Sequence, residues 1–129
     1  MQKISELYVI LEDAPGTISE LLRVLKKNKM SIYAVGLFID TARLHVSNPK
    51  KGLEVIQEHG YVVELRDVIR VELTNKPGML YEIVHKVANA GINIKNLYGA
   101  VGEKESIGVV IMETDNIPLT LDIFQNDKF

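Results

Sequence analysis

One motif occurs twice in the chain, 62 residues apart, and it limits the possible folds more than any other feature. Asp13-Ala14-Pro15-Gly16-Thr17-Ile18 reappears as Asn75-Lys76-Pro77-Gly78-Met79-Leu80. A Pro-Gly pair alone is weak evidence, because it marks many turns. Before each pair, however, apolar residues alternate as in a half-buried strand, and after it they follow the spacing of one helix face. The same change of period at both places indicates an internal repeat.

The matched apolar residues keep one offset through both copies. The strand residues are Leu7, Val9 and Leu11 in the first copy and Ile69, Val71 and Leu73 in the second. The helix residues are Ile18, Leu21, Leu22 and Leu25, matched by Leu80, Ile83, Val84 and Val87. Each helix leads through Met30-Ser31-Ile32 or Ile92-Asn93-Ile94 into a second strand. Asp13 or Asn75 can cap the helix, and proline suits a first turn because it lacks a donor.

The second half of each copy is less alike. In the first, residues 36–39 turn through Asp40-Thr41 into a strand at residues 42–46. In the second, the turn through residues 102–105 is about three residues longer and returns at residues 107–112. Leu44 and Val46 are then matched by Val109 and Ile111. A helix at about residues 50–59, ended by Gly60 as its left-handed residue, and a fourth strand at residues 61–65 complete the first copy.

Two βαββαβ modules, residues 1–66 and 67–129, are therefore predicted. Each would form an antiparallel sheet with its helices on one face, the α+β fold called ferredoxin-like. Because Arg66-Asp67 leads directly into the second copy, we expect a rigid interface and no flexible linker.

The second copy is short at its C-terminus. Only residues 126–129 remain for a fourth strand, and they have no alternating pattern, so we expect the second module to lack its last strand. Residues 117–124 fit a helix from Pro118 or an alternating strand, and we favour the helix. Loss of the last strand would expose the edge of residues 68–73. Proteins usually cover such an edge, so we expect the first module or a partner chain to occupy it.

Composition excludes several classes of function. The net charge of −2 gives no reason to expect a nucleic acid or a membrane as partner, and no cysteine is present for disulfide or thiolate chemistry. The longest N-terminal apolar run, residues 7–11, is too short for a signal peptide, which favours a soluble cytoplasmic protein. His45, His59 and His85 are isolated from one another. We therefore expect no catalytic residue, no metal site and no cofactor.

The second copy resembles the ACT domain, through Leu73-Thr-Asn-Lys-Pro-Gly-Met-Leu-Tyr-Glu-Ile-Val and Ala90-Gly-Ile-Asn-Ile. The first copy is similar in Leu11-Glu-Asp-Ala-Pro-Gly-Thr-Ile and Lys29-Met-Ser-Ile. Over nearly its full length the chain resembles stand-alone tandem ACT proteins without a catalytic domain. The resemblance implies a regulatory protein that senses a free amino acid or similar small metabolite, usually where two modules meet.

The resemblance and the chemistry of a helix start together indicate the ligand-binding residues. Free first-turn amides attract a carboxylate, and a glycine permits its close approach. Asp13 could hold an ammonium group, whereas Asn75 is neutral. Ser31 and Asn93 would complete the site from a neighbouring module. The predicted residues are Asp13, Ala14, Gly16, Thr17, Ile18, Ser31 and Ile32 in the first copy, and Asn75, Lys76, Gly78, Met79, Leu80, Asn93 and Ile94 in the second. The alternative is that Asp13 and Asn75 only cap helices.

Two other functions are compatible with the sequence. The chain could be a non-catalytic regulatory subunit of an amino-acid biosynthetic enzyme, such as acetolactate synthase, or a dimerisation scaffold with degenerate pockets. We also expect at least a homodimer, because Tyr8, Ile10, Val110 and Met112 fall on the predicted outward face of the sheets. Apolar surface of this kind usually marks an interface.

Overall fold

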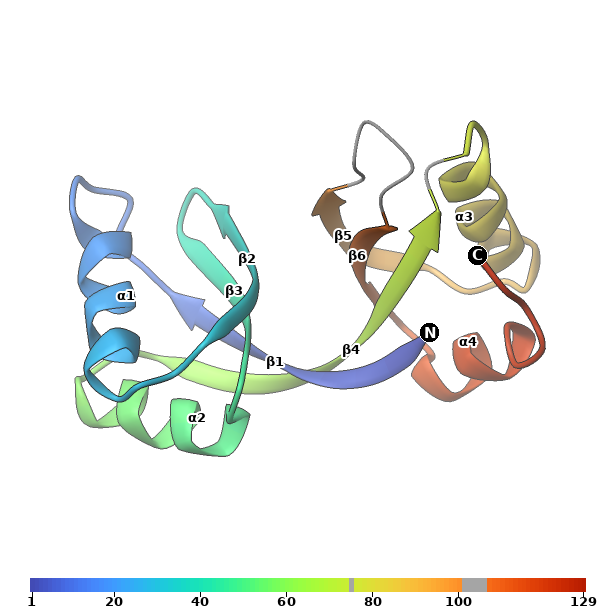
Figure 1. The fold of residues 1–129 in the computed structure, drawn as a ribbon. Coiled ribbons are helices and arrows are strands. Elements are labelled where there is room, and N and C mark those ends of the chain that lie inside the picture. The colour runs from blue at the N-terminus through green and yellow to red at the C-terminus, as the bar shows by residue number, and fades with distance from the viewer. Residues whose placement is uncertain (75, 101–106) are drawn as a thin grey trace. The chain divides into compact units, whose positions relative to one another are not determined.

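The computed structural model describes residues 1–74, 76–100 and 107–129, and these divide into two compact units (Figure 1). The first unit is Ser5–Arg66, and the second unit combines Met1–Ile4 with Asp67–Phe129. The elements in chain order are β1 (Gln2–Ile10), α1 (Thr17–Lys27), β2 (Ile32–Phe38), β3 (Thr41–Val46), α2 (Pro49–Glu58), β4 (Val63–Thr74), α3 (Met79–Asn89), β5 (Ile94–Ala100), β6 (Ile107–Thr114) and α4 (Ile117–Ile123). None of the described helices is long and apolar enough to cross a membrane.

In the first unit, the strands lie in the order β2-β3-β1-β4, and α1 and α2 cover one face. Leu7 lies opposite Leu44 and Val9 opposite Ala42, so the alternating apolar residues of β1 and β3 point to the same side. Leu21 and Leu25 of α1 and Ile56 of α2 pack onto this side and form one core with them. The predicted ferredoxin-like arrangement is confirmed. Gly60 ends the α2 region with a φ of 87°, as predicted.

The second unit repeats this architecture with β4, β6 and β5, covered by α3 and α4. Ile69 lies opposite Met112 and Val71 opposite Val110, and these four residues share a core with Ile83, Val87 and Phe124. Residues 117–123 form a helix, as favoured from the sequence. Its first turn is capped by the Asn116 side chain, which accepts a hydrogen bond from the Leu119 amide at 3.1 Å, just as Asn48 caps α2 through the Lys51 amide.

The described residues after α4 form no strand, and the start of β1 lies where the last strand of the second module would be. Residues 2–4 belong to the second unit, and β1 is the neighbour of β4 in the sheet. Met1 packs against the second unit's core, and the N-terminus lies near β4 and α4 (Figure 1). The N-terminal residues of the chain therefore lie beside part of the edge of residues 68–73. The strands predicted at residues 61–65 and 68–73 are one strand, β4.

The predicted register of the second hairpin is wrong. Ile32 pairs with Val46, and Ile94 pairs with Thr114, so the first hairpin spans 14 positions and the second spans 20. The second hairpin is therefore six residues longer than the first, whereas the prediction was about three. Leu44 therefore corresponds to Met112. Residues 102–105, the predicted turn, lie outside the described residues. Val110 and Met112 are buried beneath the helices and are not outward-facing.

The outward face of the first unit is more polar than predicted, because arginines cover its aromatic residue. The Arg66 guanidinium lies 3.6 Å and that of Arg43 5.0 Å from the centre of the Tyr8 ring. Arg43 also donates to the fully buried Glu6 carboxylate at 3.0 Å. Ile10 remains half exposed, but Tyr8 does not form an open apolar surface.

Candidate functional site

The two Pro-Gly loops start their helices in the same unusual way. The N-cap residues are Gly16 (φ 86°, ψ −8°) and Gly78 (φ 87°, ψ −8°), and among the described residues no side chain caps either helix start. This left-handed backbone favours glycine, since a Cβ would strain it. The sequence had suggested that Pro15 and Pro77 lie in the first turn of their helices. In the structure, both prolines precede the N-cap residue. Asp13 is not a cap, and Asn75 lies outside the described residues.

Side-chain and backbone hydrogen bonds close the first loop on itself. The Thr17 hydroxyl donates to the carbonyl of Glu12 at 2.8 Å and lies 3.1 Å from that of Ala14. The Ala14 carbonyl also accepts from the Thr17 amide. Ile18 packs its side chain against the core of the first unit. Ile18 could therefore contact a ligand only through its backbone. Its amide, like the other first-turn amides, has no carbonyl acceptor within the helix.

A hollow of about 510 Å³ lies beside this helix start, entirely within the first unit. It is lined by Ile10, Leu11, Glu12, Pro15, Gly16, Thr17, Glu20, Gly60, Tyr61 and Val62. Glu12 and Glu20 give the hollow an acidic rim. Tyr61 and Val62, in the segment just before β4, also line it. Burial, and next the nearby Glu20 carboxylate, raise the pKa of the Tyr61 phenol.

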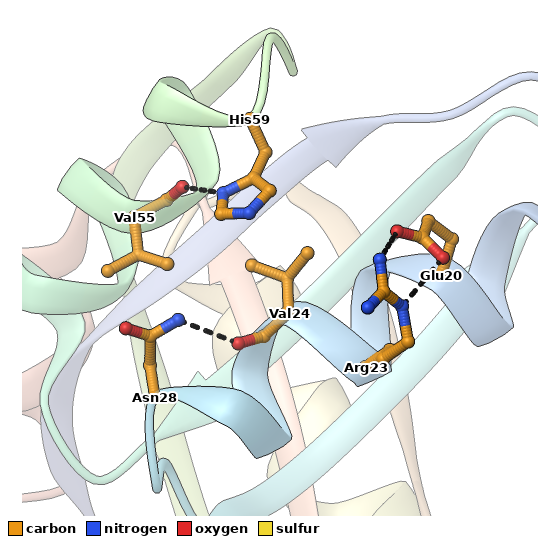
Figure 2. A network of polar contacts seen from close by, with 6 residues as sticks. All are labelled: Glu20, Arg23, Val24, Asn28, Val55 and His59. Atoms are coloured by element: carbon orange, nitrogen blue, oxygen red, sulfur yellow. Dashed lines mark hydrogen bonds and ion pairs between the residues drawn. The ribbon is translucent and has the colours of Figure 1, made fainter.

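Figure 2 shows polar contacts within α1 and α2, and Glu20, one of the residues involved, also lines the hollow. Arg23 donates from Nε to Glu20 at 3.0 Å and pairs with it through a second nitrogen, which lowers the pKa of the Glu20 carboxyl. On the same helix, the Asn28 amide donates to the Val24 carbonyl at 2.9 Å. On α2, the His59 Nδ1 donates to the Val55 carbonyl at 2.8 Å. Glu20 is thus held in place at the rim.

In the second unit, two smaller hollows lie near the corresponding helix start. One, of about 430 Å³, lies between α3 and the segment after α4, and the other, of about 280 Å³, lies beside the end of β4. Lys128 and Phe129 line both. With the corrected register, these residues correspond to Gly60 and Tyr61 of the first unit. Met79 lines the larger hollow, and the Lys76 carbonyl accepts from the Met79 amide. Leu80 is partly exposed.

The second-strand residues lie at the other end of each helix. The Ser31 amide donates to Ser47 Oγ at 3.1 Å, and the Asn93 amide donates to Asp115 Oδ1 at 3.1 Å. An 11-residue helix separates Gly16 from this end of the first unit, a length of about 16 Å. Ser31, Ile32, Asn93 and Ile94 therefore do not share a site with the Pro-Gly loop of their own unit.

Of the residues that line the hollow of the first unit, only Gly16 and Thr17 were predicted from the sequence; the others are Ile10, Leu11, Glu12, Pro15, Glu20, Gly60, Tyr61 and Val62. One signal was present, because Glu20 and Glu82 occupy the same place in both copies of the repeat. Gly60, Tyr61 and Val62 are more than 40 residues from the loop. Only the fold brings them there.

Comparison with known proteins places this geometry in a family. The fold resembles that of protein BT0572 from Bacteroides thetaiotaomicron, with a TM-score of 0.85 and 21% identity over 95% of this chain and 87% of that chain. It also resembles the ligand-free regulatory subunit of aspartate kinase from Thermus thermophilus, with a TM-score of 0.65 and 17% identity over 97% and 96% of the two chains. The regulatory subunit of aspartate kinase from Thermus flavus has a TM-score of 0.68 and 15% identity, over 96% of this chain and 94% of that chain.

No curated protein matches the chain in sequence. The family described as the ACT domain pair matches residues 2–129, almost the whole chain. Each unit contains one copy of the repeated strand, Pro-Gly loop and helix, so the two copies correspond to the two domains of the pair. The chain therefore belongs to the ACT domain family, as an ACT domain pair.

Proposed function

We propose that the chain is a non-catalytic regulatory protein that binds a free amino acid at the helix start of its first unit. The observation that carries this proposal is the hollow of about 510 Å³ beside an uncapped helix N-terminus. Its volume lies within the range of about 300–1,000 Å³ that small-molecule sites occupy. Membership of the ACT domain pair family supports a regulatory role.

Each part of an amino acid has a partner in this hollow. The first-turn amides and the positive end of the helix dipole attract the α-carboxylate. The carboxylates of Glu12 and Glu20 attract the α-ammonium group, and Ile10, Tyr61 and Val62 offer apolar surface to a side chain. Because a free amino acid has few atoms to offset the entropy of association, we expect a Kd between about 1 μM and 1 mM.

A thermal-shift screen against the individual amino acids tests the proposal, followed by calorimetry on those that bind. A ligand at 100 times its Kd should stabilise the protein by about 2.7 kcal/mol and raise Tm by several degrees. Glu12→Gln should weaken binding about tenfold, because the ligand's ammonium loses a charged partner. The control is Glu58→Gln, because Glu58 is also exposed and lies outside the hollow. Absence of any shift, or equal loss in both variants, would contradict the proposal.

A regulatory subunit of a larger enzyme is the second candidate. Two of the solved structures that the fold resembles are named as regulatory subunits of aspartate kinase, and each match covers nearly all of both chains. Acetolactate synthase, the example suggested by the sequence, remains an untested alternative. Co-purification with an amino-acid biosynthetic enzyme, and ligand-dependent inhibition of that enzyme, would favour this role. A scaffold with degenerate pockets would show neither inhibition nor a thermal shift.

We also propose that the chain forms a homodimer through β2. This is an edge strand of the first unit, without a charged residue between Ile32 and Phe38. Tyr33, Val35 and Leu37 are 62%, 50% and 51% exposed. Natural edge strands are usually protected by charges or proline. In the second unit, the edge strand β5 carries Lys95. Antiparallel pairing of two β2 strands would cover the unprotected edge.

Light scattering with size-exclusion chromatography measures this association. The protein should elute as a dimer at micromolar concentration, and Val35→Lys should produce a monomer, because the lysine would place a charge in the new interface. Leu97→Lys on β5 introduces the same charge on the other edge strand and should leave the dimer intact. A monomeric wild-type protein, or equal effects of both substitutions, would exclude the β2 interface.

A further inference from the structure

Five exposed lysines gather at one end of the first unit, away from the hollow. They are all the lysines of Ser5–Arg66, namely Lys26, Lys27, Lys29, Lys50 and Lys51. Two lie in the last turn of α1, one follows that helix, and two lie in the first turn of α2. The hollow lies beside the start of α1, whereas the lysines lie around its end, so the two features are separate.

Two contacts join the segments that carry these lysines. Lys51 Nζ donates to the Asn28 carbonyl at 3.5 Å. A Cβ on Gly52 would lie 3.2 Å from Met30 Sδ, so the start of α2 packs closely on the segment after α1. The five side chains therefore form one surface, the lysine patch. In the part of the chain that the structure describes, no carboxylate forms an ion pair with any of them within 4 Å.

The fold does not require the charges of the lysine patch. The second unit forms the equivalent helices α3 and α4, and none of the residues there that correspond to the five lysines is charged. They are Ala88, Asn89, Gly91, Pro118 and Leu119. Stabilisation of a helix dipole accounts for Lys26 and Lys27 alone, because these two lie near the negative end of α1.

The other three lysines occupy places where they lower stability. Lys29 has a left-handed backbone with a φ of 55°, which favours glycine, and the second unit has Gly91 at this place with a φ of 74°. Lys50 and Lys51 lie at the positive end of the α2 dipole, in a first turn without an acidic residue. Residues that break local rules in this way are typical of functional surfaces.

We propose that the lysine patch binds an acidic, extended segment of another protein. Lysine carries a compact charge on a flexible stem, so several lysines together attract a run of carboxylates through their summed charge. Arginine is the usual residue for a fixed, two-pronged contact with a single carboxylate or phosphate. The last turn of α1 and the first turn of α2 contain no arginine. The proposal does not rest on ligand binding in the hollow.

The charges next to the patch favour a narrow partner. Glu54 and Glu58 follow Lys50 at intervals of four residues, so they continue the same exposed face of α2. A membrane surface or a nucleic-acid duplex is broad and would bring its own negative charge against these carboxylates. An extended segment can lie along the lysines alone.

Fluorescence anisotropy with a labelled glutamate peptide tests the proposal on the full chain. A peptide of about twelve residues, half of them glutamate and the rest glycine and serine, stays unfolded and carries no other recognition element. It should bind at least about tenfold more tightly than the same peptide with glutamine in place of glutamate, and salt should weaken its binding. Equal binding of the two peptides overturns the proposal. So does tighter binding of duplex DNA, or of vesicles of phosphatidylserine and phosphatidylcholine, than of the glutamate peptide.

Two substitutions in the patch separate binding from stability. Lys29→Gly removes the left-handed strain, and Lys50→Glu places a negative charge at the positive end of α2, so each should keep or raise Tm. Lys50→Glu should nevertheless weaken binding of the glutamate peptide about tenfold, and Lys29→Gly about threefold. The control is Lys95→Gln, which removes an exposed lysine of β5 in the second unit and should leave the affinity unchanged. Wild-type affinity in both patch variants, or an equal loss in the control, overturns the proposal.

Discussion

Replacement of Arg43 by methionine is expected to lower the free energy of unfolding by about 3–5 kcal/mol. Arg43 Nη1 lies 3.0 Å from Glu6 Oε1, and the two side chains are 8% and 0% exposed. Methionine keeps much of the apolar volume but removes the positive charge. The Glu6 carboxylate would then remain in the interior without this guanidinium, and a buried charge that loses its partner is strongly destabilising.

Urea unfolding measures this effect, with Arg23→Met as the control. Arg23 pairs with Glu20 on α1, but these two side chains are 50% and 48% exposed. Water screens such a pair, so the control should lose far less stability than Arg43→Met. The double variant Glu6→Leu, Arg43→Met should recover part of the loss, because it removes both charges together. If Arg43→Met and Arg23→Met are equally stable, loss of the buried pair costs no more stability than loss of an exposed pair, and the prediction is wrong.

Deletion of residues 2–4 should open the edge of β4 in the second unit. These residues are part of β1, the neighbour of β4, and Ile4 is buried. In a sheet, alternate amides of a strand point to each of its two neighbours. Every second amide in the part of residues 68–73 that lies beside residues 2–4 should therefore lose its protection from hydrogen exchange, and its rate should rise at least about a hundredfold. The remaining amides of this segment, which face β6, should stay protected.

A substitution that keeps the backbone provides the control for this deletion. Gln2 and Lys3 are exposed, so their replacement by threonine preserves the strand and its pairing. Exchange at residues 68–73 should then remain slow. Rapid exchange in the intact protein, or slow exchange after the deletion, would show that residues 2–4 do not protect this edge.

The elements around the Pro-Gly loops could be predicted because their patterns are local. Alternation before the loop and helical spacing after it each place apolar residues on one face, and packing in the structure follows that assignment. The register of β6 could not be predicted in this way. Its sequence Ile-Gly-Val-Val-Ile-Met is apolar on both faces, so periodicity does not distinguish the buried face from the outward one. The wrong choice shifted Met112 and Val110 to the outward side.

The candidate site was only partly predictable for a similar reason. The motif identified the helix start, but the interpretation of Asp13 as a cap assumed a conventional helix entry. The left-handed Gly16 takes the N-cap position instead, and no side chain caps the first turn. Tyr61 and Val62 reach the hollow only after α2 and its terminal glycine have reversed the chain. No local pattern connects residue 61 with residue 16.

The sharing of β1 between the units has a consequence for the order of events during synthesis. Residues 2–4 leave the ribosome before their neighbours in β4, which begin 65 residues later, at residue 67. At about 5–20 residues per second, this leaves the segment without its partner for several seconds. The first unit can complete its own strands in that interval, while the sheet of the second unit is completed by a segment that was synthesised much earlier. When many copies are made together, the waiting segment can reach the β4 of another copy, so rapid overproduction should yield a fraction of strand-exchanged dimers.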